Sequence, residues 1–335
     1  MRGLLVFVLA LGTLWGGYWV VGSAALQSGA EKWFAGQNDN GVEASYADLV
    51  VKGFPNRFDL TVTDLHLADP VTGFGWDAPF AQVFSLSWKP WHLIAALPNS
   101  QTVTVPDQAI AVGSTSLMGS LKLVPGSALT LDAVVMDGAD VVATSTLGWV
   151  VKAARAQVST RQDTSVVNGH EVNVTVTGLI PDPALMAAMG PASDFSPLIE
   201  TAQIDVIAGF SAPIDRFIGQ SKPQLSALTV KQALVRWGDV ELALTGAVVA
   251  DADGYAEGRI DIALTNWRRV LAPAVAMGLI KAEVAPTVEN MMALMAQQSG
   301  DPAVLELPLL MTSGRMSLGP LPLGPAPRMA AGPQS

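Results

Sequence analysis

Cysteine is missing from this sequence: none of the 335 residues is one. Its absence excludes disulfide bonds, thiolate zinc sites, iron–sulfur clusters and a cysteine nucleophile. It does not identify the compartment, because a chain without cysteine is compatible with an oxidising periplasm and with the cytosol. Thiol chemistry is therefore excluded wherever the protein works.

Charged residues are scarce as well, at 14% of the chain against a usual share near ~25%. Hydrophobic residues make up 50%, which excludes disorder over most of the length, because disordered chains are rich in charge and poor in apolar residues. With 19 Lys and Arg against 29 Asp and Glu the net charge is −10, which disfavours a nucleic-acid partner. The mean hydropathy of +0.37 is high for a soluble protein, and one apolar segment explains only part of it.

Motifs that carry chemistry are few. The three histidines, His66, His92 and His170, stand in no metal-binding spacing, and no nucleophile-elbow motif is present. Residues 73–78 match a dinucleotide fingerprint only superficially, and residues 251–254 open like a calcium loop but lack its later ligands. We therefore predict a non-enzymatic protein with no catalytic, cofactor-binding or metal residue. A hydrolase with a dispersed Ser/His/Asp site stays open as a less favoured alternative, since triads are defined by geometry.

The N-terminus carries the strongest signal. Residues 3–22 contain no charge, and twenty helical residues span roughly 30 Å, the thickness of a bilayer core. We expect a membrane anchor over residues 1–25, with a cleaved signal peptide as the alternative, because Ser23–Ala25 offers small residues near a cleavage site. Arg2 places the N-terminus in the cytoplasm, so we expect a single pass through the inner membrane and a periplasmic body. The anchor residues are Leu4, Leu5, Val6, Phe7, Leu9, Leu11, Leu14, Trp15, Tyr18 and Trp19.

The body, residues 26–325, reads as short strands separated by turns, because β-branched and apolar residues alternate with polar ones at period two. We predict a mainly β fold of curved antiparallel sheets with few helices, forming a groove or an open, barrel-like half-pipe. The alternating residues are candidates for an apolar groove or a packed core, and the sequence does not choose between the two. They are Phe58, Leu60, Val62, Phe84, Leu86, Trp88, Leu129, Leu131, Val172, Val174, Val176, Ile204, Val206, Leu242, Leu244, Ile260 and Ile262.

Several local elements can be placed along the body. The most regular unit is a long hairpin from Val240 to Leu264, and Asp137–Gly138 and Ser313–Gly314 read as turns. Helices are predicted for residues 183–189, for 267–280 with Asn266 as N-cap, and for 286–298. Residues 180–197 are rich in proline and form the best internal boundary, and residues 326–335 read as a disordered tail.

The segment Trp88-Lys89-Pro90-Trp91 has two interpretations. It is either part of a belt at the lipid headgroups or an ordinary packing contact. Because a lone exposed tryptophan is costly, we expect Trp76, Trp88 and Trp91 to lie on one wall or at an interface. Just before a strand, residues 53–58 read as a hairpin entry with Arg57 as a rim charge.

Taken together, several segments resemble a family of Gram-negative envelope proteins known as domain of unknown function 2125. The resemblance rests on the anchor followed by YADLVVKGFPNRFDLTVTDLHLADP, LALTGAVVADADGYAEGRIDIALTNW and SGRMSLGPLPLG, and runs from about Gly3 to Gly324. That family is in turn distantly similar to AsmA-like proteins. The resemblance implies an inner-membrane anchor, a periplasmic β-sheet bent into a groove, and a part in lipid traffic or outer-membrane assembly.

These observations give two main hypotheses for function. In the first, the protein binds or handles lipid, with acyl chains on an inward apolar surface, or serves envelope biogenesis. In the second, it is an envelope scaffold whose helix pair at 267–298 docks partner proteins. Neither hypothesis requires a cofactor. The partners expected are the inner membrane, a lipid or acyl-chain ligand, and other envelope proteins.

Overall fold

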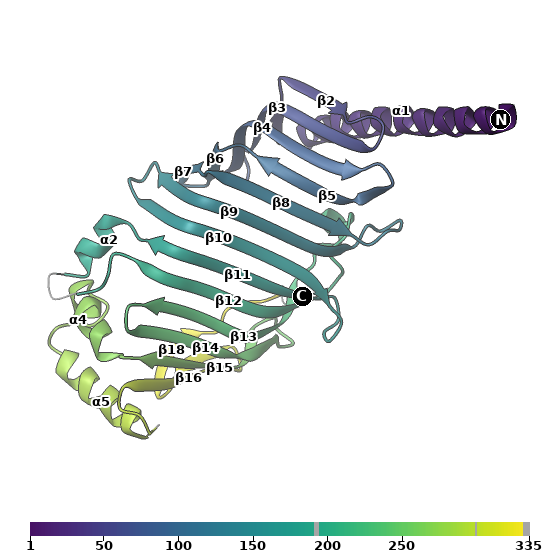
Figure 1. Ribbon diagram of the computed structural model, residues 1–335. Helices are drawn as coiled ribbons and strands as arrows, with labels where there is room; N and C mark the ends of the chain where they lie inside the picture. The colour runs from purple at the N-terminus through teal and green to yellow at the C-terminus, as the bar shows by residue number, and fades with distance from the viewer. Residues whose placement is uncertain (191–193, 299, 331–335) are drawn as a thin grey trace. The chain divides into compact units, whose positions relative to one another are not determined.

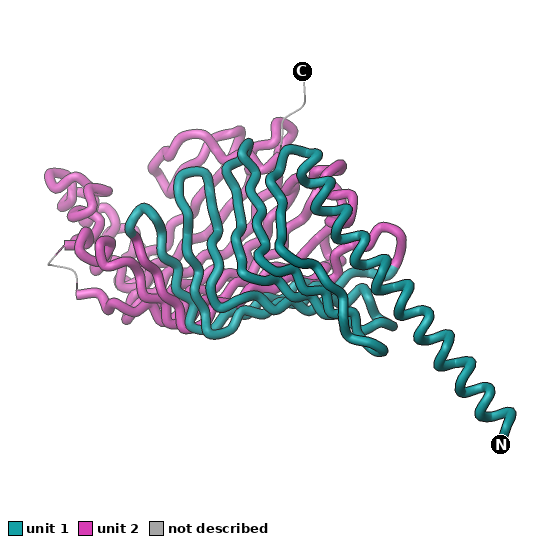
Figure 2. Tube along the Cα trace, turned by 90° about the horizontal axis from the view of Figure 1, so that it is seen from above, with its two compact units in different colours: residues 1–125, 134–148 teal, residues 126–133, 149–335 magenta. Residues whose placement is uncertain are grey.

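The computed structural model describes residues 1–190, 194–298 and 300–330 (Figure 1). The chain divides into two compact units, which Figure 2 shows in different colours. Unit 1 comprises residues 1–125 and 134–148, and unit 2 comprises residues 126–133 and 149–335. The expected boundary at 180–197 lies inside unit 2, where it connects two strands that pair with each other, so it does not separate compact bodies.

Unit 1 consists of one long helix and an antiparallel sheet. Strand β3 pairs with β1, β2 and β4, strand β4 also pairs with β5 and β6, and β5 and β7 pair with β8 and β9 respectively. The elements are α1 (Arg2–Asp39), β1 (Glu43–Ser45), β2 (Asp48–Lys52), β3 (Arg57–Asp69), β4 (Phe74–Leu86), β5 (Lys89–Leu97), β6 (Ser100–Val105), β7 (Gln108–Gly113), β8 (Ser116–Leu123) and, from residue 134 on, β9 (Leu131–Ser145).

Unit 2 is an antiparallel meander in which each strand pairs with the next along the chain. Its strands are β10 (Val150–Asp163), β11 (Gly169–Ile180), β12 (Ile199–Phe210), β13 (Leu225–Trp237), β14 (Val240–Ala250), β15 (Ala256–Thr265), β16 (Val304–Thr312), β17 (Arg315–Leu318) and β18 (Leu321–Pro325). Its helices are α2 (Pro183–Ala188), α3 (Ile218–Ser221), α4 (Arg268–Ala276) and α5 (Ala285–Gln298). The predicted mainly β, antiparallel fold with few helices is confirmed.

The C-terminal edge of unit 2 curls back on itself. After β18, the carbonyl of Pro327 accepts a hydrogen bond from the N–H of Ala256 at the start of β15, and the N–H of Met329 donates to Gly254. Ala326 is buried. Residues 326–330, which the sequence assigns to a disordered tail, are therefore held in the fold by a backbone ladder, and residues 331–335 lie outside the described part.

Two local predictions are wrong. Asp137–Gly138 is not a turn but part of the continuous strand β9, and the hydroxyl and N–H of Thr115 both donate to the neighbouring carbonyl of Ala139. Asn266 does not cap α4: its backbone φ is +56°, and its side-chain amide donates to the carbonyl of Asp239. In both places contacts from residues distant in the sequence override a local sequence preference. The predicted Val240–Leu264 hairpin and the Ser313–Gly314 turn are confirmed.

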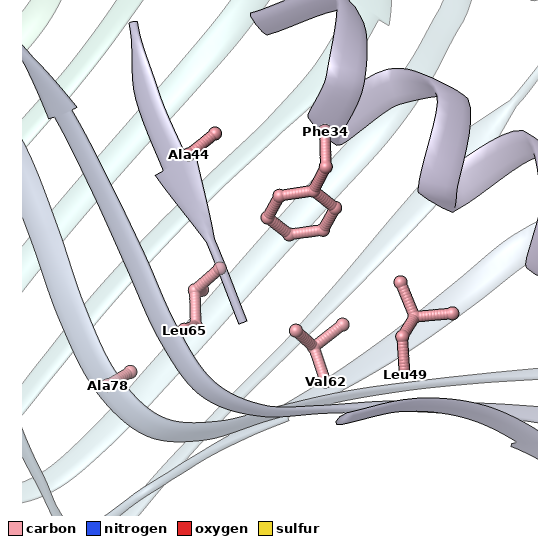
Figure 3. Close-up of a cluster of buried hydrophobic side chains, with 6 residues drawn as sticks. All are labelled: Phe34, Ala44, Leu49, Val62, Leu65 and Ala78. Atoms are coloured by element: carbon pink, nitrogen blue, oxygen red, sulfur yellow. The ribbon is translucent and has the colours of Figure 1, made fainter. Parts of the chain in front are cut away.

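Each unit has small cores rather than one large one. In unit 1, Phe34 of α1 packs on the sheet beside Leu49, Val62 and Leu65 (Figure 3). In unit 2, a first cluster gathers around Ile260 and Ala326, and a second around Trp267, where α5 meets β16. Helix α1 and the C-terminal segment therefore cover only part of the sheet in their own units.

Candidate apolar surfaces and membrane anchor

The strand register of unit 2 gathers apolar side chains on one face. Residues directly opposite each other on antiparallel strands point to the same side of a sheet. Val174 on β11 lies opposite Val158 on β10 and Ile204 on β12, and the same row continues through β13 to Leu244 on β14 and Ile262 on β15. The rows on either side are also largely apolar. We call this surface the apolar face of unit 2.

Nine of the predicted groove residues lie on this one face. They are Val172, Val174, Val176, Ile204, Val206, Leu242, Leu244, Ile260 and Ile262. A β-bulge in β13 after Val230 keeps Val230 and Ala233 on the same side despite their odd spacing, so the apolar rows stay aligned across the meander.

The opposite face of unit 2 is polar. Glu171 accepts hydrogen bonds from Lys231 and Arg161. Both bonds lower the pKa of the Glu171 carboxyl below its ordinary value, and the bond from Lys231 has the larger effect. Asn173 and Asp205 lie opposite each other on the same side. The sheet of unit 2 is thus amphipathic, as expected where an antiparallel sheet turns one face to water.

The apolar face of unit 2 is covered at one edge and open at the other. At β15 and β16, Ile260 and Leu305 are buried beneath the C-terminal segment and α5. On β10 to β12 no apolar-face residue of the central rows is buried, and Val158 and Ile204 keep 41% and 44% of their surface exposed. We call this region the open patch; it comprises Ala156, Val158, Val172, Val174, Val176, Ala202, Ile204 and Val206.

Unit 1 repeats the arrangement with a different cover. Leu60 and Val62 on β3 lie opposite Val83 and Ala81 on β4, and α1 covers this part through Phe34. Beyond the helix the same face continues across β5, β8 and β9 and is hollowed into a groove of about 210 Å³. Its lining is apolar except for Ser120: Val83, Leu93, Ala95, Leu97, Gly119, Leu121, Val134, Val135 and Met136. This volume is below the ~300–1,000 Å³ typical of a site for a whole small molecule, so it suits one segment of a chain-like ligand.

Several predicted groove residues lie elsewhere. Phe84 is opposite Asp59, so it points away from Phe58, Leu60 and Val62, which share the other face. Leu86 is on the same outward side as Phe84, and Trp88 lies in the turn that follows. The alternation within one strand shows which of its residues share a face, but it does not show which of its two faces a strand turns toward the core. For this reason the sequence pattern alone placed Phe84, Leu86 and Trp88 in one group with the residues of β3.

The remaining predicted positions lie near the ends of strands. Leu129 precedes β9 with a φ of +51°, and Leu131 opens β9, where its N–H donates to the carbonyl of Ile214. The expected tryptophan wall is not formed: Trp76 donates to Gln101 at one end of β4 and packs against the core of unit 1, whereas Trp88 lies past the other end of that strand.

A cavity of about 690 Å³ lies in unit 2. It is lined by the ion pair of Arg259 with Asp261, by Glu306, and by apolar groups that include Met295 and Leu307. The side-chain hydrogen bond to Asp261 raises the pKa of the Arg259 guanidinium above its ordinary value. The lining thus combines an ion pair and a carboxylate with apolar groups, and it contains no histidine.

The histidines are scattered. His66 on β3 lies 2.5 Å from Asp77, and His170 is buried 3.5 Å from the hydroxyl of Thr160. Burial lowers the pKa of His170. Within the described ranges no histidine hydrogen-bonds a serine, and no three His, Asp or Glu side chains gather closely enough to hold a metal ion.

Helix α1 is long and apolar enough to cross a membrane, which indicates membrane anchoring. The predicted anchor residues lie on it, and Leu4 to Leu14 have most of their surface exposed. The helix does not stop at residue 25 but continues to Asp39, with Ala30 and Phe34 packed on the sheet of unit 1. The predicted anchor ended at residue 25, and the packing of Ala30 and Phe34 on the sheet was not predicted, although their spacing by four residues is the signal for one buried helical face.

Comparison with known proteins gives a family and no function. No curated protein and no solved structure matches the chain, and a similarity to AsmA-like proteins is not among the findings. A family model described as "Uncharacterized protein conserved in bacteria (DUF2125)" matches residues 19–327, which is nearly the whole chain. The chain therefore belongs to the DUF2125 family of conserved bacterial proteins.

Proposed function

We propose that this protein is anchored in the inner membrane by α1, carries its body in the periplasm, and holds the acyl part of a lipid on its uncovered apolar surfaces. Its work is then lipid handling or envelope biogenesis, without catalysis and without a cofactor. The single observation that carries the proposal is the open patch of unit 2, a set of aligned apolar rows that the described residues leave partly exposed.

The energetics favour an apolar occupant. Exposed apolar surface costs about 25 cal/mol for each Å² that could be buried, and contiguous exposed patches of this kind mark interaction sites on soluble domains. Val158, Val174 and Ile204 offer no hydrogen-bonding group, so a polar ligand gains nothing from them. An acyl chain matches both the chemistry of the patch and the groove of about 210 Å³ in unit 1.

The location is argued from α1 and from the flanking charge. Arg2 is the one charged residue before the apolar run, and positive residues favour the cytoplasmic side. A role near lipid traffic is an analogy with AsmA-like proteins, to which the sequence analysis relates the DUF2125 family, and the comparisons add no support to that link.

The test is lipid capture by the full-length protein. We expect native mass spectrometry of the detergent-purified chain to show bound phospholipid, and the triple variant Val158→Thr, Val174→Thr, Ile204→Thr to retain at least threefold less. The matched control is the triple variant Gln157→Ser, Thr175→Ser, Gln203→Ser. It changes three paired residues of the same strands whose side chains lie on the opposite, polar face of the sheet. Absence of lipid, or equal retention by both triple variants, would count against the proposal.

A scaffold role is the second candidate, and one observation favours it. Leu279 and Val284, between α4 and α5, and Leu294 on α5 are exposed apolar residues around a helix pair. Such residues are typical anchors for a partner helix or groove. Crosslinking from these positions in cells should recover a defined envelope protein, and failure to recover one while lipid is retained would favour the lipid-binding function.

A further inference from the structure

Helix α1 is fastened to two β-turns of unit 1 at the level where its apolar run ends. The first turn, residues 53–57, joins β2 to β3, and the second, residues 87–88, joins β4 to β5. We call residues 53–57 and 87–90 together the rim. Figure 1 shows α1 running past these strand ends and beyond the sheet of unit 1.

Three side chains of α1 donate hydrogen bonds to backbone carbonyls of the rim. The Trp15 indole N–H donates to Pro55 at 3.0 Å, the Tyr18 hydroxyl to Ser87 at 2.5 Å, and the Trp19 indole N–H to Arg57 at 2.7 Å. Each of these bonds pairs a side-chain donor of α1 with a carbonyl acceptor of the rim, so these groups need no hydrogen bond from water. The junction is therefore compatible with the low dielectric constant of a membrane.

The two turns are also tied to each other and packed against the helix. Ser87 is fully buried, and its N–H donates to the carbonyl of Asn56 at 2.9 Å. The ring of Phe58 lies so close to Gly22 that an added Cβ there would be 2.7 Å from it. Helix and rim therefore form one built contact, and the height of α1 in a membrane sets the height of the rim.

The length of the free helix fixes that height. The apolar run begins after the charge of Arg2, and the twelve residues 3–14 that lie between Arg2 and the first rim contact at Trp15 span only about 18 Å at ~1.5 Å each. A bilayer core is roughly 30 Å thick, so about 12 Å more of apolar helix, residues 15–22, must also lie within it. The first acidic residue of the chain, Glu31, comes well after this stretch.

The surface of the rim suits this depth. Phe54 and Trp88 expose 61% and 52% of their surfaces, and they contact Trp19 and Trp15 of the helix at ring distances of 5.3 and 6.4 Å. The charges around them are mainly positive, from Lys52, Arg57 and Lys89, with Asp59 paired to Arg57, although the whole chain carries −10. Aromatic tips with flanking cations are characteristic of groups seated at anionic headgroups.

We propose that the rim is a second membrane-contact site, in which Phe54 and Trp88 insert beneath the headgroups of the outer leaflet beside α1 and the nearby cations meet lipid phosphates. The inference rests on the membrane anchoring proposed above. It gives the Trp88–Trp91 segment the role of a lipid belt and brings the β2–β5 end of unit 1 to the membrane surface.

Depth measurement with single-cysteine labels tests the proposal, because the natural chain has no cysteine to remove. An environment-sensitive fluorophore is attached to Phe54→Cys, Trp88→Cys, Leu9→Cys and Val71→Cys variants of the full chain in nanodiscs of phosphatidylcholine and phosphatidylglycerol. Val71 is the matched control: it is 89% exposed and lies in the turn at the far end of the β3–β4 hairpin. Should Trp88→Cys fail to fold, Pro90→Cys gives the same reading.

We expect spin-labelled lipid to quench the labels at residues 54 and 88 at least twofold more than the label at residue 71, and iodide to do the reverse. Equal iodide quenching at residues 54, 88 and 71, with Leu9 still in lipid, would overturn the rim proposal and leave the anchoring intact. If the label at Leu9 is also open to iodide, the anchoring itself fails and the rim proposal fails with it.

Discussion

Both units bury one part of an apolar sheet face and leave the rest uncovered, but they use different covers. In unit 1 the cover is the second half of α1, the same helix whose first half is apolar enough for a membrane. In unit 2 the cover comes from the chain's own C-terminal segment and from α5. Unit 1 therefore couples its core to the anchor, whereas unit 2 closes its core without it. The predictions below test that difference.

The largest effect should come from removing the cover of unit 1. Phe34→Ala deletes the buried ring under α1, and such changes cost about 3–5 kcal/mol. We expect hydrogen exchange, followed by mass spectrometry, to rise in peptides from β2 to β4 while peptides from β10 to β16 keep their protection. Trp267→Ala in unit 2 should show the converse pattern. Loss of protection across both units from either change would contradict the comparison.

Two substitutions on the apolar face of unit 2 compare how much stability its covered part and its open patch contribute. Ile260→Ala, under the C-terminal segment, should lower the unfolding free energy of unit 2 by about 2–4 kcal/mol. Ile204→Ala, in the open patch, should cost under ~1 kcal/mol, because a half-exposed side chain loses little burial. Urea denaturation of the full chain in detergent measures both. Equal losses would show that the open patch is covered after all.

The junction between α1 and unit 1 should be sensitive at one glycine and not at another. Gly22→Ala places a methyl group against the Phe58 ring, which is itself buried and has little room to move, and overpacking of this kind costs about 1–3 kcal/mol. Gly17→Ala on the same helix meets no atom within 4 Å and should be neutral or slightly stabilising. Thermal unfolding of the two variants should differ in this order; no difference would place α1 away from Phe58.

The smallest effect concerns pH and belongs to unit 2. Burial lowers the pKa of His170 in the folded state. As the pH drops, the imidazole is therefore protonated at a higher pH in the unfolded chain than in the folded one, and the free energy of unfolding falls below about pH 6.5. Glu171, whose pKa is also lowered, adds a further loss below about 4.5. His170→Asn should flatten the stability profile between pH 7 and 5, because it removes the group whose pKa differs between the folded and unfolded chain. An unchanged slope in His170→Asn would refute the assignment.

The local pattern of strands was predictable, and the reason is visible at particular residues. The alternation at Val172, Val174 and Val176 and the hairpin from Val240 to Leu264 place each residue on its strand, because period two is a local property. The candidate residues of unit 2 consequently fall on a single face. The sequence also showed that residues 3–22 form an apolar run of membrane length.

What depends on distant contacts could not be read from the sequence. The face of Phe84 is set by its pairing with Asp59, the strand through Asp137 and Gly138 by neighbouring β-strands, and the conformation at Asn266 by Asp239. Likewise, whether an apolar face is buried depends on which remote segment returns to it. Phe34, near the N-terminus, packs on β3, and Ala326, near the C-terminus, packs on β15. The residue spacing within these two strands does not predict which distant segment will bury them.

The central claim, that the uncovered apolar surfaces hold acyl chains, is tested most directly by photocrosslinking. The full-length protein is reconstituted with a phospholipid that carries a diazirine on its acyl chain, irradiated and digested. The account predicts adducts on α1, on the open patch around Val158, Val174 and Ile204, and on the groove of unit 1, with few on the polar face around Asn173 and Asp205. Adducts confined to α1 and the rim, with none on the open patch or the groove, would contradict it.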